Sequence, residues 1–161
     1  MAVTQQLARL TERQIALCGS DVAMLERVCG GEELPADDYA QLDWAPAMLN
    51  RAAARSGLAH RFVEALERST AGSRELHPGY TGLFATYEAL TCLSEAETAA
   101  IAALLDTIDT RTLLSPPAVE AANEGFGVTD PQGYLLEMFE RLRGFYDGAA
   151  RRGMGMALWW D

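Results

Sequence analysis

A run of acidic side chains between residues 32 and 43 is the densest group of chemically active residues in the sequence. The segment has five carboxylates and no basic residue, and two aromatic residues stand beside them. The candidate partner-binding residues are Glu32, Glu33, Asp37, Asp38, Tyr39, Asp43 and Trp44. Because carboxylates attract cations over a distance, the segment predicts a surface for a basic protein partner. The alternative is a solvated acidic loop that keeps the protein soluble.

His60, Glu64 and His77 form a second group with binding chemistry. On a helix, positions 60 and 64 lie on one face, and His77 in a following loop could supply a third metal ligand. The sequence contains neither an H-E-x-x-H motif nor a C-x-x-C motif, which many metal sites use. We therefore interpret His60 and Glu64 as an exposed polar pair and predict no metal-binding residue.

The sequence lacks residues on which several common catalytic motifs depend. All 13 basic residues are arginine, which excludes the lysines of P-loops, Schiff bases and Ser-Lys dyads. None of the six serines lies in a G-x-S-x-G motif, and the G-x-G triplets at 125–127 and 153–155 do not lead from a strand into a helix. These motifs therefore predict no catalytic residue and no cofactor.

Two classes of function are compatible with these residues. The first is a non-enzymatic binding or regulatory module, and an immunity-type protein that masks a basic toxin is one form of it. The alternative is a small-ligand binder or an enzyme whose pocket is built by separate elements from arginines, carboxylates and His77, Tyr80 or Tyr87. Spacing in the sequence does not distinguish the two, because such a pocket assembles only in three dimensions.

The composition is that of one globular domain. The 161 residues are 49% hydrophobic and 22% charged, and 23 acidic residues against 13 basic ones give a net charge of -10. This charge disfavours nucleic acids and anionic membranes as partners. No apolar stretch has the length of a membrane span, the first six residues do not resemble a signal peptide, and the three cysteines suit a reducing compartment. We expect a cytoplasmic protein, as a monomer or a homodimer.

Residue patterns predict three strands. Their residues are 3–10, 83–90 and 154–160. Every residue from Gly155 to Trp160 is apolar or glycine, so both faces of the last strand need cover. We expect this strand to be buried, and its pairing with residues 3–10 would join the two ends of the chain.

Helices are predicted between these strands, with loops over residues 32–43 and 70–82. Capping boxes begin at Thr11 and Ser94, and Asp43 is the expected N-cap of a helix over 44–55. Further helices are expected over residues 58–68, from Ser115 to about Glu124, and from Thr129 to Arg152. The last of these has a continuous apolar stripe and should be the core helix; the stripe is Leu135, Met138, Phe139, Leu142, Phe145, Tyr146 and Ala149.

Three parts of the chain carry a resemblance to a known family. They are the N-terminal strand at 3–10, the Leu42-Asp43-Trp44 segment that opens a helix, and a closing helix and strand at 134–146, 149–153 and 157–160. In these features the chain resembles the YfbM-like family of small bacterial proteins of unknown function. Many relatives have a histidine a few residues after the tryptophan, where this chain has Met48, Leu49 and Asn50.

The resemblance implies one α+β domain over residues 1–161. The domain is expected to be mostly helical, with a small sheet that includes the N-terminal, a central and the C-terminal strand. The family supplies no established catalytic residues, so the resemblance assigns none to this chain.

Overall fold

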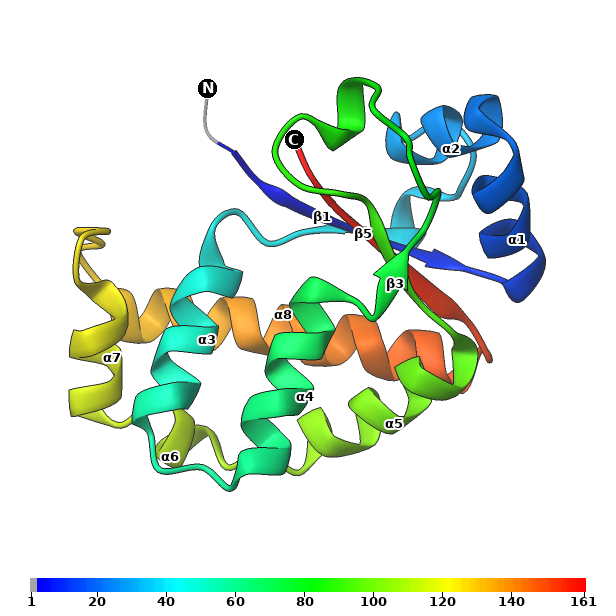
Figure 1. The fold of residues 1–161 in the computed structure, drawn as a ribbon. Helices are drawn as coiled ribbons and strands as arrows, with labels where there is room; N and C mark the ends of the chain where they lie inside the picture. The colour runs from blue at the N-terminus through cyan, green and yellow to red at the C-terminus, as the bar shows by residue number, and fades with distance from the viewer. Residues whose placement is uncertain (1–2) are drawn as a thin grey trace.

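The computed structural model describes residues 3–161, whose strands form one five-stranded sheet. The expectation that the first six residues do not form a signal peptide concerns residues 1 and 2 in part, and these two lie outside the described residues. The strands are β1 (Gln5–Leu10), β2 (Tyr39–Gln41), β3 (Arg74–Glu75), β4 (Thr91–Leu93) and β5 (Gly155–Trp160), in the spatial order β2-β1-β5-β4-β3. β5 is therefore the central strand, and it pairs antiparallel with β1, as predicted (Figure 1).

Helices cover both faces of this sheet. They are α1 (Glu12–Ser20), α2 (Val22–Cys29), α3 (Ala45–Arg55), α4 (His60–Ala71), α5 (Glu95–Asp106), α6 (Thr110–Leu113), α7 (Pro116–Asn123) and α8 (Pro131–Arg151). Figure 1 shows α3, α4, α5 and α8 below the sheet, with α1 and α2 at its upper right. Within residues 3–161, no helix combines the length and the apolar character that crossing a bilayer requires.

The alternation of side chains along β1 and β5 divides the interior into two clusters. Leu7 and Leu158 pack with residues of α3, α5 and α8, whereas Ala8 and Trp159 pack with residues of α1 and α2. Successive residues of a strand point to opposite faces, so a central strand with helices on both sides must be apolar throughout. The predicted two-sided burial of the C-terminal strand is confirmed.

α8 is the main helix of the larger cluster. Its seven buried residues are those of the predicted stripe, and Asp130 caps its start by accepting a hydrogen bond from the Gly133 amide. In the C-terminal part of the helix, the Tyr146 hydroxyl donates to the Ser69 carbonyl of α4 at 2.8 Å. The predicted capping boxes at Thr11 and Ser94 are also present. The α+β fold class is therefore confirmed.

The predicted strand over residues 83–90 is wrong. Leu83–Ala85 form a 3-10 turn, η2, and the strand in this part of the chain is β4, which begins only at Thr91. Leu83 is 77% exposed and Tyr87 is 47% exposed. Aromatic and β-branched residues favour a strand where a partner strand and a covering layer are available, and residues 83–90 have no such partner in the sheet.

The two predicted loops contain short strands. Residues 32–43 include a 3-10 turn, η1 (Ala36–Asp38), and the edge strand β2, which pairs with β1. Residues 70–82 include β3, which pairs with β4, and α4 extends past its predicted end to Ala71. Strands of two or three residues are too short to show an alternating pattern, so the sequence could not reveal them.

The start of α3 also differs from the prediction. Trp44, not Asp43, is the N-cap, and it makes no side-chain cap bond. Asp43 has a φ of 47°, and its carbonyl accepts a hydrogen bond from the Gln5 amide at 2.9 Å. The backbone of Asp43 is thus used to turn the chain from β2 into the helix, which removes its side chain from the capping position.

Candidate functional site

The acidic segment 32–43 contains one buried carboxylate. Asp38 is 3% exposed, and both of its oxygens accept hydrogen bonds from the Arg152 guanidinium at the end of α8. The Arg9 guanidinium on β1 lies 3.6 Å from the same carboxylate. The hydrogen bonds from Arg152, reinforced by the charge of Arg9, hold the pKa of Asp38 below its ordinary value. Asp38 therefore anchors the segment and does not present its charge to solvent.

Arg9 connects this anchor to α8 and to the acidic segment itself. Its Nε donates to the Phe145 carbonyl at 3.1 Å, and its Nη1 donates to the Asp37 carbonyl at 3.1 Å. The guanidinium lies 4.0 Å from the centre of the Phe145 ring, and burial lowers the pKa of Arg9. A side chain at Gly148 would meet this guanidinium at 2.6 Å. The glycine thus leaves room for the arginine against the helix.

The exposed carboxylates of the segment lie just before this anchor. Glu32, Glu33 and Asp37 are exposed, and Glu33 pairs with Arg27 at 2.9 Å. Glu32 and Asp37 have no ion-pair partner in the described part of the chain. Two of the predicted carboxylates are thus free to meet a partner.

Of the remaining predicted residues, one holds the segment in place and the others lie at or near the surface. The Tyr39 hydroxyl donates to the Val28 carbonyl of α2 at 2.8 Å, so this side chain fastens the segment to the second helix. Trp44 is 42% exposed at the start of α3, and Asp43 beside it is half-buried. The segment therefore ends at an exposed aromatic side chain that is large enough to anchor an interface.

The residues considered for a metal site are not brought together. His60 and Glu64 are exposed on α4, whereas the His77 Nδ1 atom lies 2.8 Å from the Cys18 carbonyl of α1. Among residues 3–161, no three histidine, cysteine or acidic side chains are arranged to hold a metal ion.

His77 instead lies beside a tyrosine whose hydroxyl contacts a carboxylate. Its ring is 6.2 Å from that of Tyr80, in an edge-to-face arrangement. The Tyr80 hydroxyl donates to Glu26 Oε1 of α2 at 3.1 Å. Because a carbonyl only accepts, the contact with Cys18 assigns a proton to Nδ1.

An open groove of about 470 Å³ lies between α7 and the start of α8. We call it the α7–α8 groove. Its lining combines apolar carbons with carboxylates and amides, and its only charged side chains are acidic. The lining residues are Pro116, Val119, Glu120, Asn123, Glu124, Pro131 and Gln132.

Two smaller hollows lie elsewhere. One of about 120 Å³ separates α4 from α5 and is lined in part by Arg61, Glu64 and Ile101. The other, of about 20 Å³, lies beside β5 and is lined in part by Gln5 and Trp160. The Oε1 atom of buried Gln5 has no hydrogen-bond partner among residues 3–161. A space of this size holds no more than a water molecule.

The α7–α8 groove was not predicted from the sequence. Both of its helices were predicted, and their first turns contain Pro116 and Pro131, but a predicted helix start does not reveal a groove beside it. The available signal was the pair Glu120 and Glu124, which lie four residues apart at the end of α7 without a basic residue at the same spacing.

The fold is similar to that of a solved bacterial protein. YfbM from Escherichia coli, a protein of unknown function, aligns with a TM-score of 0.68 and 16% sequence identity, over 98% of this chain and 99% of that chain. The resemblance to a YfbM-like protein is thus confirmed, as a likeness of fold over the full length. No protein-family model and no curated protein matches the sequence.

Proposed function

We propose that this chain is a non-enzymatic binding module for a basic protein partner, and that an immunity-type protein masking a basic toxin is one form of this function. The ion-pair cluster of Asp38, Arg9 and Arg152 carries the proposal. It fixes the acidic segment to β1 and α8, so the carboxylates before it are held in place before any partner arrives. A preorganised surface loses less conformational entropy on binding than a free loop.

The overall charge supports the same function. A net charge of -10 gives the molecule a long-range attraction for cations, and such a field accelerates the encounter with a basic protein. The exposed Trp44 supplies the kind of apolar anchor that carries much of the affinity in protein interfaces.

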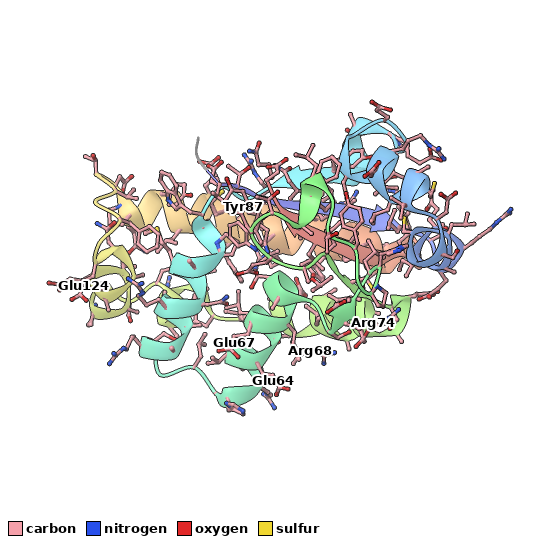
Figure 2. The ribbon with its side chains drawn as sticks, turned by 45° about the horizontal axis from the view of Figure 1, so that its top comes forward. Glu64, Glu67, Arg68, Arg74, Tyr87 and Glu124 are labelled. Carbon is pink, nitrogen blue, oxygen red and sulfur yellow. The ribbon has the colours of Figure 1, made fainter. Side chains whose placement is uncertain are left out.

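Two charge-reversal variants test the proposal. Glu32→Lys with Asp37→Lys changes the acidic segment, and Glu64→Lys with Glu67→Lys changes two exposed carboxylates of α4 that project from the helix in Figure 2. Both variants change the net charge equally. The wild-type protein is used to capture partners from the native lysate. Each captured protein is identified and purified, and calorimetry measures its affinity for wild type and for both variants. We expect a basic protein whose affinity falls about tenfold or more in the first variant and less in the second. A partner that both variants weaken equally would argue against the acidic segment.

A second candidate function is small-ligand binding beside α2. The contacts of His77, Tyr80 and Glu26 favour it, since the imidazole ring lies beside the Tyr80 phenol, whose hydroxyl donates to the Glu26 carboxylate. A thermal-shift screen of small metabolites tests it, with Tyr80→Phe as the matched variant. A compound that stabilises wild type and fails to stabilise the variant would support this function, and a screen without such a compound would argue against it.

A further inference from the structure

We infer that the α7–α8 groove receives an arginine or lysine side chain of a basic protein segment, an inference that rests on the proposed binding of a basic partner. The lining of the groove includes the apolar side chains of Pro116, Val119 and Pro131, and its charged side chains are Glu120 and Glu124. Long basic side chains lay their methylene stems on apolar surface while the charged head finds a carboxylate. The groove offers both parts of this arrangement.

The two carboxylates are not neutralised within the chain. Neither Glu120 nor Glu124 has an ion-pair partner in the part of the chain that the structure describes. The nearby Arg51 donates from Nη1 to the backbone carbonyl of Glu124 at 2.7 Å and lies 5.2 Å from the Phe126 ring centre. This arginine therefore supports the backbone of the groove rather than pairing with the carboxylate of Glu124.

The start of α8 does not cancel the negative charge that Glu120 and Glu124 give the groove. A helix N-terminus carries a partial positive charge that would favour an anion in the groove. Here the Asp130 carboxylate already caps that end, with its Oδ1 accepting from the Gly133 amide at 3.0 Å. The groove thus keeps a negative character even though Pro131 and Gln132 of the first turn line it.

The wall of the groove is also fixed before binding. The Asn123 side chain donates to the Val128 carbonyl at 3.0 Å and accepts from the Val128 amide at 2.9 Å. These two bonds close the turn between α7 and α8, in which Gly125 and Gly127 have φ values of 82° and 68°. Figure 2 shows Glu124 at the extreme end of the molecule, where a protein segment can approach it.

The open form of the groove favours a protein segment over a free small cation. Pockets for small molecules enclose most of their ligand, whereas this groove lies along the surface between two helices. A basic side chain of a partner protein needs to bury only one of its sides in the groove, because other contacts of the partner supply the rest of the binding energy. The occupant is therefore a basic segment, not a free amine.

Titration with acetyl-leucyl-arginine amide, followed by ¹H–¹⁵N correlation spectra of the full chain, tests this inference. We expect saturable shifts of the backbone amides from Val119 to Glu124. The variant Glu120→Gln with Glu124→Gln should bind the dipeptide about tenfold more weakly, from the loss of two exposed charge pairs. The matched variant Glu64→Gln with Glu67→Gln should keep the wild-type affinity, and thermal melting confirms that both variants fold.

Two further ligands define the results that would overturn the inference. The citrulline analogue has the same shape without the charge, so equal binding of this analogue excludes recognition of a cation. Agmatine carries the guanidinium without the peptide, so equal binding of agmatine excludes preference for a protein segment. If the variant Glu120→Gln with Glu124→Gln binds the dipeptide as tightly as wild type, the two carboxylates do not recognise the cation and the inference is wrong.

The result separates this inference from the proposed function. If the dipeptide leaves the groove unshifted while Glu32→Lys with Asp37→Lys still abolishes partner binding, the groove inference fails and the proposed function stands. If the groove binds the dipeptide but no basic partner is found, the site stands and the proposed function fails.

Discussion

Asp38 shows how the role of one residue depends on a contact far away in the sequence. Its carboxylate is buried against an arginine 114 residues later in the chain, and that contact changes an acidic surface residue into an internal anchor. A buried charge of this kind is tolerated because it is paired and hydrogen-bonded. The binding surface that we propose is therefore smaller than the seven predicted residues and better fixed.

Asp38→Asn should reduce stability at neutral pH by about 1–3 kcal/mol, because the arginines lose a charged acceptor. The pKa of Asp38 is lowered in the folded protein, so its stabilising contribution is complete above the ordinary carboxyl pKa of about 3.9 and is lost as the pH falls through the lower folded pKa. The difference between wild type and variant should thus shrink toward pH 2. Urea denaturation at pH 7 and pH 2.5 measures it.

Asp37→Asn is the matched control for this prediction. It changes an exposed carboxylate next to the anchor, and it should alter the free energy of unfolding by less than about 0.5 kcal/mol. Equal effects of the two substitutions would mean that Asp38 contributes no more than a surface charge.

At the scale of elements, β5 determines how the rest of the molecule packs. It lies between β1 and β4 in the sheet and between two clusters of helices across it. Its first residue, Gly155, has little free space, because an added Cβ would meet the Leu93 carbonyl oxygen at 2.4 Å and Ile15 Cδ1 at 2.6 Å. The close approach of β4 and α1 to this strand therefore depends on a glycine.

Substitution of two glycines by alanine should give effects of opposite sign. Gly155→Ala should destabilise the protein by about 1–3 kcal/mol, because the Leu93 carbonyl belongs to β4, which is paired on both sides and cannot move aside easily. Gly144→Ala on α8 meets no atom within 4 Å and should stabilise by about 0.5–1 kcal/mol through helix propensity. Thermal and urea denaturation measure both. A tolerated Gly155→Ala would show that β4 and β5 are less tightly packed than described.

At the scale of the whole molecule, excess negative charge opposes folding. Six of the 23 acidic side chains form ion pairs among the residues that the structure describes, and like charges at this density repel one another in the compact state. Such repulsion accompanies the acidic surface that we propose for a basic partner.

Added salt should therefore raise the melting temperature. Screening weakens the surface ion pairs as well as the repulsion, but the excess of acidic residues makes the repulsion the larger effect. We expect an increase of about 2–4 °C between 10 mM and 500 mM salt, equivalent to about 1 kcal/mol for a chain of this size. Sodium and potassium chloride should act alike in calorimetric scans. A fall in melting temperature would mean that the ion pairs contribute more than the repulsion costs.

The sequence alone determined those features that arise within one contiguous segment. The capping boxes at Thr11 and Ser94 bond to backbone only three residues away, and the stripe of α8 repeats with the period of the helix itself. Two-sided burial of β5 followed from its uninterrupted apolar composition. Such patterns are visible in a sequence because the interacting groups are neighbours along the chain.

Only the tertiary structure decided the features that join distant segments. The short strands β2 and β3 exist because β1 and β4 lie beside them, and the apolar stretch from Leu83 to Leu90 is not a strand because no strand pairs with it. The Asp38 anchor likewise requires side chains from β1 and from the end of α8. These contacts depend on how the chain is folded back on itself, and no local pattern of residue types encodes that.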